Sequence, residues 1–204
     1  LGPEYSDRNI LYELKKNNLK YIKIKNPEKY LAKKLDQGYV VACFQGRMEF
    51  GPRSLGNRSI LVNACDKSVN GWLNKKLKRT EFMPFAPITL NKFANKMYKG
   101  LKNKKKAVKY MTITTDCTSL AAKISPAAVH IDKTARPQII NKIDNKKIYK
   151  ILNEYYKISK IPNLINTSFN VHEEPIVCSP NDAVRAYRES KIDYLFIGDY
   201  IVER

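Results

Sequence analysis

Apolar residues recur every three to four positions in several segments of the chain, which is the period of an amphipathic helix. These segments are residues 6–19, 26–38, 68–78, 143–158 and a last one that starts at residue 179. Ser6 and Ser179 stand at N-cap positions, and a proline follows Asn26 and Ser179 where a helix takes its first turn. The pattern therefore predicts helices in these segments, and it places Trp72 in the core on the apolar face of the third.

Short apolar or alternating runs between these segments predict strands. The runs are residues 39–44, 110–115, 164–165 and 194–202, with two further strands around a turn in residues 125–140. The run 194–202 predicts either a strand pair or one strand bent at Gly198. Residues 78–90 are expected to be extended and to lead into a strand, and residues 91–109 to form a helix and a loop. Since helices and strands interleave throughout, we expect one α/β domain spanning residues 1–204.

The formal net charge of +19 is extreme for 204 residues and admits two interpretations. One is a surface that binds a polyanion, and the other is a lysine-rich composition whose charges lie on solvated faces. We favour the second, because lysine is scattered over the predicted helices with one dense run at residues 102–106. No apolar run has the length of a membrane span, and no signal-peptide pattern opens the chain at Leu1. We expect a cytoplasmic protein, either an excised domain or a processed product.

The four cysteines and two histidines show no metal-binding spacing. No pair of cysteines forms a CxxC motif, so the pattern does not favour a zinc site. Reduced and mostly buried thiols are the expectation for a cytoplasmic protein.

Two polar strings stand at the ends of predicted strands, where ligand sites of α/β proteins form. The first, GRMEFGPRSLGNRSIL, sets Arg47, Arg53 and Arg58 on a backbone that turns at glycine and proline. Fixed guanidinium groups suit an anion of defined geometry, such as a phosphate. The second, NTSFNVHEEPIV, carries hydroxyls and amides, with Ser168 and Asn170 on the same side of an extended segment. The two strings together predict a site for a polar, phosphorylated ligand.

Three further polar groups are candidates for the same chemistry. They are Lys78 with Arg79, the group His130, Asp132 and Arg136, and the pair Glu173 and Glu174. A lysine supplies a mobile charge that suits phosphoryl or adenylyl transfer. Structural roles compete, because Asp132 and Arg136 can form a turn salt bridge, His130 can be a packing residue, and the Ser-x-Asn pair can satisfy loop backbone. The chain has neither a P-loop nor a GxGxxG motif, so ATP would need a different cradle.

Four strings in this order, GRMEFGPRSLGNRSIL, LKRTEFMPFAP, HIDKTARPQ and NTSFNVHEEPIV, closely resemble the C-terminal domain of the O-carbamoyltransferases that act in nodulation-factor and antibiotic biosynthesis. LGPEYSD is similar to the start of that domain, so the resemblance covers nearly the whole chain. It implies a YrdC-like fold, an open twisted α/β sheet with flanking helices and a concave, positively charged cavity. It also implies use of carbamoyl phosphate, ATP and Mg²⁺ to form carbamoyl adenylate. The carbamoyl group then passes to a hydroxyl in a Kae1-like N-terminal domain, to which nothing in this chain corresponds.

The resemblance also assigns roles to single residues. It implies that Arg53, in GPRSLG, binds carbamoyl phosphate and that Lys78 meets the phosphate groups and the adenylate, which makes these two the candidate catalytic residues. The residues that it implies for binding of substrate and nucleotide are Arg58, Arg79, Arg136, Ser168 and Asn170.

Two positions depart from the family pattern. Lys133 and Glu173 stand where the family usually has glycine. Glycine often marks left-handed backbone or a close approach of the chain. We therefore expect the two side chains to strain their turns or to crowd the cavity, which would affect activity and leave the fold intact.

Two other functions stay open on the sequence alone. A threonylcarbamoyl-adenylate synthase would use threonine and bicarbonate on the same YrdC-like fold, but the arginine-rich and NTSFN strings favour the carbamoyltransferase branch. A non-catalytic RNA-binding module would fit the net charge, yet the chain carries no RNP motif, so we rank nucleic acid below small phosphorylated ligands.

Overall fold

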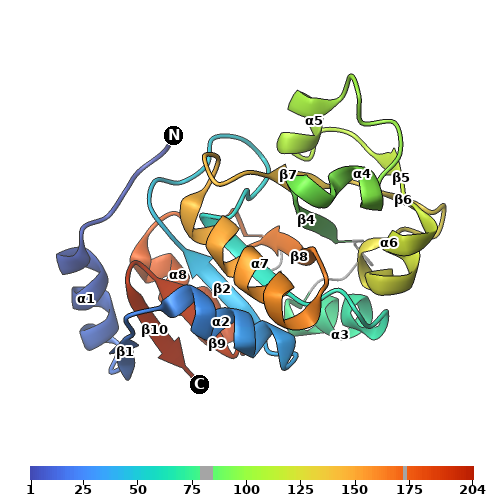
Figure 1. The fold of residues 1–204 in the computed structure, drawn as a ribbon. Coiled ribbons are helices and arrows are strands. Elements are labelled where there is room, and N and C mark those ends of the chain that lie inside the picture. Colours follow the sequence, from blue (N-terminus) through green and yellow to red (C-terminus); the bar gives the residue numbers. More distant parts are fainter. Residues whose placement is uncertain (79–84, 172–173) are drawn as a thin grey trace.

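A mixed β-sheet forms the centre of the molecule in the computed structural model, which describes residues 1–78, 85–171 and 174–204. In these residues the sheet has eight strands in the order β1-β10-β9-β2-β3-β8-β4-β7 (Figure 1). They are β1 (Tyr21–Lys23), β2 (Val41–Phe44), β3 (Arg58–Val62), β4 (Ala86–Leu90), β7 (Gln138–Ile140), β8 (Asn163–Ser168), β9 (Tyr194–Ile197) and β10 (Tyr200–Glu203). β2 pairs with β9 and β4 with β7 in parallel, whereas the other neighbours are antiparallel.

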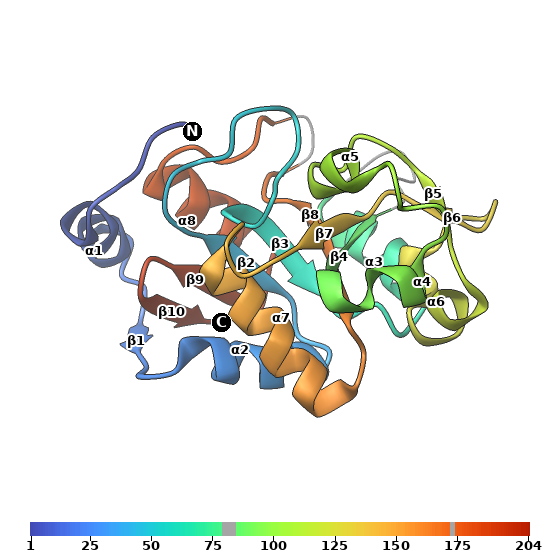
Figure 2. The same cartoon turned by 45° about the horizontal axis from the view of Figure 1, so that its top comes forward.

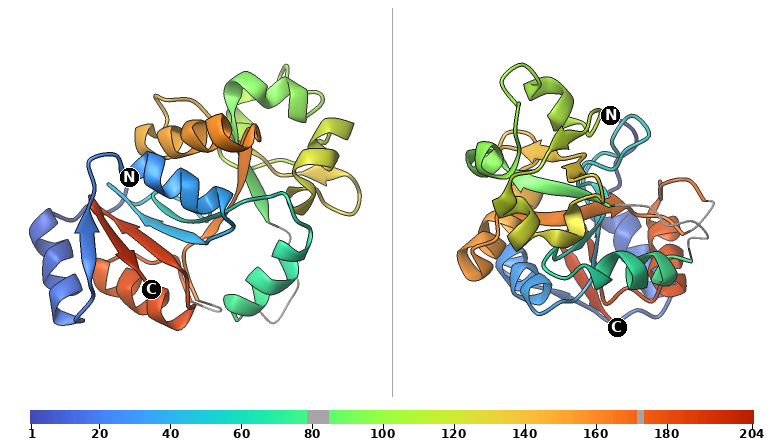
Figure 3. Two further views of the ribbon diagram at one scale, coloured as in Figure 1. Left: turned by 60° about the horizontal axis from the view of Figure 1, so that its bottom comes forward. Right: turned by 90° about the vertical axis from the view of Figure 1, so that its right-hand side faces the viewer.

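Helices cover both faces of this sheet. The larger ones are α1 (Asp7–Lys16), α2 (Pro27–Asp36), α3 (Ser68–Lys76), α7 (Lys146–Ser159) and α8 (Pro180–Glu189). α2 and α7 lie side by side on one face, and α3 and α8 lie on the other (Figure 3). Because successive strand residues point to opposite faces, Val41 and Cys43 of β2 join the core under α2 and α7, and Ala42 and Phe44 join the opposite core.

A smaller lobe lies over the β4–β7 end of the sheet (Figure 2). It contains η1 (Asn91–Phe93), α4 (Ala94–Met97), α5 (Lys105–Lys109), β5 (Thr115–Asp116), α6 (Ser119–Ile124), η2 (Pro126–Ala128) and β6 (Thr134–Ala135). Its core is built around Met97, Tyr98 and Val108, which are buried. The lobe brings Met111 and Arg136 next to the strand ends at Ala86 and Ser168.

The predicted α/β class is confirmed, as are the helices that correspond to α1, α2, α3, α7 and α8. Ser6 and Ser179 both form capping boxes, with the side chains of Asn9 and Asp182 as the reciprocal partners. Residues 194–202 form the strand pair, β9 and β10, which turns at Gly198 with φ of +58°.

The prediction for Trp72 is wrong, because its side chain is 36% exposed. The buried stripe of α3 follows Val69 and Leu73 and continues to Leu77 beyond the helix end. Spacings of four residues place this stripe toward the sheet, and Trp72 lies at its flank.

Two strand predictions in the smaller lobe are also wrong. Residues 110–115 do not form a strand over their length, because Met111 has a left-handed backbone with φ of +54° and the Thr112 N–H donates back to Ala107. Pro126 starts a 3₁₀ turn where the first strand of residues 125–140 is predicted. In residues 91–109 the expected helix and loop are present as α4 and the loop after it, and a second short helix, α5, follows.

Within the described ranges, no helix combines the length and the apolar character that a membrane span requires. The four cysteines are free. Cys43 and Cys117 are buried as expected, whereas Cys178 is half-buried and Cys65 is exposed.

Candidate functional site

The end of one strand, β8, meets the starts of two others, β3 and β4, around a small cavity. β8 runs antiparallel to β3 and β4, with Ser59 opposite Ser168 and Ala86 opposite Asn166. The end of β8 therefore meets the start of β3, the loop before β3, and the start of β4. The cavity has a volume of about 70 Å³ and is lined by Pro52, Arg53, Ser54, Phe85, Ala86, Met111, Arg136, Asn166, Thr167 and Ser168. It brings together three of the residues predicted from the sequence: Arg53, Arg136 and Ser168.

One carboxylate accepts several backbone hydrogen bonds from the loop that carries Arg53. Oε1 of Glu49 accepts hydrogen bonds from the backbone N–H groups of Leu55 at 2.8 Å, Asn57 at 2.5 Å and Arg58 at 3.4 Å. A carboxylate that accepts several backbone amides fixes a loop strongly, because charge-assisted hydrogen bonds are short and strong. The exposed Arg53 thus extends from a loop whose backbone is fixed on the far side.

Arg58 does not line the cavity, and its expected role in ligand binding stays a prediction. Its side chain is fully buried, and Nη1 donates to the carbonyl oxygens of Gln45 at 2.8 Å and Asn57 at 2.9 Å. Nη2 donates to Gly46 at 3.2 Å, and Cζ lies 3.6 Å from the ring centroid of Phe44. Burial lowers the pKa of Arg58, and the charge of Glu49 opposes this shift. We interpret Arg58 as the residue that shapes the loop from within.

Arg136 faces the cavity from the segment between β6 and β7. It is half-buried, and its Nε atom has no hydrogen-bond partner in the described part of the chain. Burial lowers the pKa of Arg136, and the positive charge of Arg53 lowers it further. Two guanidinium groups that repel each other across one cavity are arranged to bind an anion between them.

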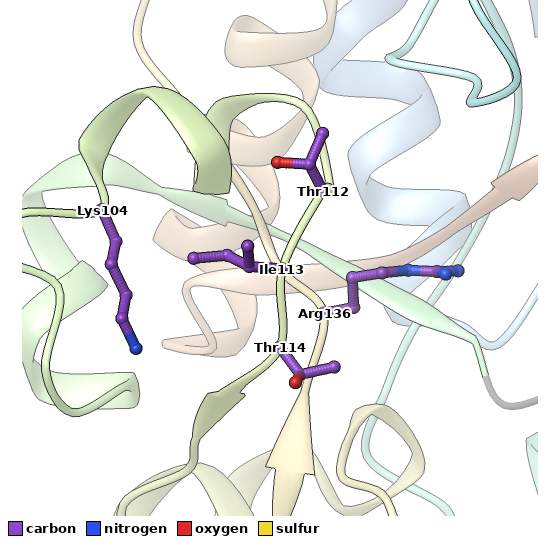
Figure 4. Close-up of a pocket in the computed structure, with 5 residues that line it drawn as sticks. All are labelled: Lys104, Thr112, Ile113, Thr114 and Arg136. Carbon is purple, nitrogen blue, oxygen red and sulfur yellow. The ribbon is translucent and has the colours of Figure 1, made fainter.

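Arg136 also lines a second, open cleft of about 570 Å³ (Figure 4). The other residues that line it are Lys104, Thr112, Ile113 and Thr114. The cavity and the cleft therefore adjoin at Arg136.

The two residues of the Ser-x-Asn pair have different places: Ser168 lines the cavity and Asn170 does not. Oγ of Ser168, which lines the cavity, donates to Oδ1 of Asn170 at 2.6 Å. Nδ2 of Asn170 donates to the carbonyl oxygens of Val171 at 3.1 Å and Glu174 at 2.9 Å. Asn170 therefore satisfies loop backbone and orients Ser168, and it does not line the cavity itself.

The structure does not bring Lys78 to the cavity. Lys78 is exposed just beyond the end of α3, with a left-handed backbone at φ of +56°. Its neighbour Arg79 lies outside the described residues, as does Glu173. The predicted roles of Lys78 and Arg79 therefore stay predictions.

The turn that precedes Arg136 is held by Thr134. Oδ1 of Asp132 accepts from the N–H of Thr134 at 3.0 Å and from its Oγ1 at 2.7 Å, and Nδ1 of His130 lies 3.1 Å from the same hydroxyl. In the described part of the chain Asp132 thus caps this turn and forms no salt bridge with Arg136. Lys133 is exposed in the turn with φ of +64°, so glycine would suit its backbone. Its side chain lies outside the cavity lining.

The sequence prediction missed two residues of the site, Ser54 and Gln138. Nδ2 of Asn166 donates to the carbonyl oxygen of Ser54 at 3.2 Å and to Oε1 of Gln138 at 2.7 Å, and Nε2 of Gln138 donates to the carbonyl oxygen of Leu55 at 2.9 Å. These bonds join β7, β8 and the arginine-bearing loop. Serine and glutamine carry no motif signal of their own, and only the order of the strands shows that they meet.

Comparison with known families places this site in context. A family model described as Carbamoyltransferase C-terminus matches residues 32–204. An uncharacterized protein of Methanocaldococcus jannaschii is 38% identical over 211 residues, which cover 100% of this chain and 34% of that protein. Nodulation protein NolNO of Sinorhizobium fredii is 34% identical over 82% of this chain and 25% of its own length. Nodulation protein U of Azorhizobium caulinodans is 38% identical over 69% of this chain and 24% of its own length. The chain thus spans a minor part of each of these relatives.

Solved structures show the same fold. The crystal structure of full-length HypF in a phosphate- and nucleotide-bound form matches with a TM-score of 0.60 at 20% identity, over 83% of this chain and 24% of that one. The crystal structure of HypF from T. kodakarensis matches with a TM-score of 0.56 at 20% identity, over 84% and 21%. At this identity the likeness concerns the fold alone, and it agrees with the open α/β architecture predicted from the sequence.

Proposed function

Because the chain belongs to the carbamoyltransferase C-terminus family, we propose that its cavity binds carbamoyl phosphate and that the chain uses ATP to convert it to carbamoyl adenylate. The observation that carries the proposal is the pair Arg53 and Arg136, which line one small cavity together with Ser168. A phosphate group placed between the two guanidinium groups would relieve their repulsion and accept hydrogen bonds from both. HypF, which shares the fold, has been crystallised with phosphate and nucleotide bound, and this supports the proposed ligand class.

The volumes of the cavity and of the cleft suit carbamoyl phosphate and ATP, respectively. A water molecule needs roughly 10–15 Å³ of such space, so the cavity of about 70 Å³ has room for a small molecule of a few non-hydrogen atoms and not for a nucleoside. The open cleft of about 570 Å³ falls within the range of roughly 300–1,000 Å³ that is usual for small-molecule sites. We therefore assign the carbamoyl phosphate to the cavity and the nucleotide to the cleft, with Arg136 at their junction.

The proposed reaction has two steps. Water first hydrolyses carbamoyl phosphate to carbamate and inorganic phosphate. A carbamate oxygen then attacks the α-phosphorus of ATP, the bond to the bridging oxygen breaks, and pyrophosphate leaves. The chain would contribute positioning and fixed positive charge, with Arg53 and Arg136 next to the phosphates and Lys78 as the predicted mobile cation. Enclosure also serves the reaction, because carbamate and its adenylate are labile in water.

The described residues gather no group of three or more His, Cys, Asp or Glu side chains that could hold a metal ion. Mg²⁺ is usually held by one or two carboxylates together with the phosphates of its substrate, and we assign no step to a protein-bound metal. Mg²⁺ enters the proposal only as the ion that usually accompanies the phosphates of ATP.

We further propose that the carbamoyl group passes to a substrate hydroxyl in a Kae1-like acceptor domain, in the same chain or in a partner. The short coverage of the relatives supports this, since this chain matches only 25% of NolNO and 24% of nodulation protein U. The acceptor would then be recognised by that other domain.

A calorimetric titration with carbamoyl phosphate, and with a non-hydrolysable ATP analogue plus Mg²⁺, tests the proposal together with ATP–pyrophosphate exchange. We expect saturable binding and exchange that requires carbamoyl phosphate, both lost in Arg136→Gln. Arg47→Gln is the matched control, because Arg47 is exposed and donates to the carbonyl oxygens of Leu1 and Gly2, away from the cavity. Exchange that depends on threonine and bicarbonate would overturn the proposal, as would failure of the wild-type chain to bind carbamoyl phosphate.

A further inference from the structure

Asn166, which lines the cavity, carries a hydrogen-bond acceptor that is unpaired among the described residues. Asn166 is 1% exposed and lines the cavity from β8. Its Nδ2 atom donates to Ser54 and Gln138, but its Oδ1 atom is buried without a hydrogen-bond partner in the described part of the chain. An unsatisfied buried acceptor costs about 1–3 kcal/mol, and a donor group that enters the cavity with a ligand would remove this cost.

The orientation of this amide follows from its neighbours. Nε2 of Gln138 donates to the carbonyl oxygen of Leu55, which leaves Oε1 of Gln138 as an acceptor toward Asn166. The second neighbour, the carbonyl oxygen of Ser54, is also an acceptor. Since both neighbours accept, the Asn166 atom between them must be the NH₂ group, and a flipped amide would place three oxygens together. The free atom is therefore an oxygen that can only accept.

The residues that line the cavity differ in their exposure to solvent. Asn166 and Ser54 are 1% and 4% exposed, whereas Arg53 is exposed and Arg136 half-buried. Phe85, Ala86 and Met111 supply apolar wall. These exposures place the two cations nearer to solvent than Asn166.

Resting on the function proposed above, we propose that Asn166 selects the carbamoyl group by accepting a hydrogen bond from its NH₂ group. Carbamoyl phosphate has a partner for both kinds of group. Its phosphate can bind Arg53 and Arg136, and its opposite end carries an N–H donor for Asn166. Acetyl phosphate is the matched competitor, because a methyl group of nearly the same size replaces the NH₂ and cannot donate. A site built to pair a donor rejects the analogue that lacks it, because the polar atom of the site then stays unpaired.

The test compares affinities for carbamoyl phosphate and acetyl phosphate, each measured by calorimetry. We expect the wild-type chain to bind carbamoyl phosphate about 10- to 100-fold more tightly, which corresponds to one unpaired buried acceptor. In Asn166→Leu the ratio of the two dissociation constants should fall to near one. Gln138→Leu is the control, since it removes the same Asn166–Gln138 bond but leaves Oδ1 in place, with the Ser54 carbonyl still holding Nδ2. It should weaken both ligands and preserve the ratio.

If Asn166 has only a structural role, its replacement should weaken the binding of both ligands alike. An unchanged ratio of the two dissociation constants in Asn166→Leu therefore overturns the inference. Asn166→Ser serves as a second, smaller variant if the leucine does not fold, and wild-type discrimination needs no variant. Equal affinity of the wild type for both ligands, with exchange still dependent on carbamoyl phosphate, overturns the selectivity and leaves the proposed function standing. Failure to bind either ligand overturns both.

Discussion

Arg53 and Arg136 line one cavity from different elements, and the charge of Arg53 adds to burial in lowering the pKa of Arg136. In the empty site the two positive charges repel each other, which is unfavourable. A bound anion would offset this repulsion. If the two arginines bind the proposed anion, the repulsion that lowers stability in the empty site is the same feature that favours the ligand.

Arg53→Gln should weaken carbamoyl phosphate binding by at least about tenfold, since a hydrogen bond to a charged group contributes roughly 1.5–3 kcal/mol. The variant should unfold at the same temperature as the wild type or slightly higher, because the repulsion with Arg136 is removed. Calorimetry and a thermal unfolding scan measure the two effects. A variant that binds as the wild type does would show that Arg53 makes no contact with the phosphate.

Arg58 should behave in the opposite way. Arg58→Met leaves the carbonyl oxygens of Gln45, Gly46 and Asn57 without their donor, so we expect the free energy of unfolding to fall by about 3 kcal/mol or more. Urea unfolding measures this, with Arg53→Met as the control for loss of an arginine in the same loop. If Arg58→Met keeps its stability but no longer binds the ligand, Arg58 would be assigned to ligand binding.

Most of the framework can be predicted from the sequence. The caps at Ser6 and Ser179 and the apolar periods predict the long helices, because those signals are local. The smaller lobe is predicted poorly because tertiary contacts override the local pattern there, as in the left-handed backbone of Met111.

The candidate site shows a similar division. Arginine among glycine and proline marks Arg53 as a ligand-binding residue in the sequence itself, but the same signal marks Arg58, which the fold buries. Only the pairing of β8 with β3 and β4 shows which of the two lies at the cavity, and Gln138 reaches Asn166 because β7 and β8 both pair with β4.

Lys133→Gly should keep or raise stability, by up to about 1 kcal/mol, because glycine removes the left-handed strain at φ of +64° but loses more chain entropy on folding. Carbamoyl phosphate affinity should not change, since Lys133 is exposed outside the cavity lining. Urea unfolding and calorimetry test both parts. A clear gain in affinity would show that Lys133 crowds the site.

His130 should make stability depend on pH. Burial lowers the pKa of His130, and the charges of Asp132 and Arg136 act in opposite directions on it. The unfolded chain then takes up a proton at a higher pH than the folded chain does. The stabilising contribution is thus fully present above the ordinary histidine pKa of about 6.5 and is lost as the pH falls through the folded value.

Thermal unfolding between pH 5 and pH 8, two values that bracket the ordinary histidine pKa of about 6.5, measures this effect. The wild type should lose stability toward the lower value, and His130→Gln should lose less of it. An equal pH dependence in both proteins would assign the effect to other groups.

Lys78 is the predicted catalytic residue that the structure leaves apart from the cavity. Lys78→Asn is the suitable test, because asparagine tolerates the left-handed backbone at φ of +56° and should not lower the unfolding temperature. If Lys78 meets the phosphates during adenylation, ATP–pyrophosphate exchange should fall by about 10²–10³-fold, as when one fixed donor to developing charge is removed. Lys75→Asn, an exposed lysine one turn earlier on α3, should retain exchange. Wild-type exchange in Lys78→Asn, together with lost exchange in Arg53→Gln, would exclude Lys78 from the chemistry and leave the two arginines of the cavity as its source of positive charge.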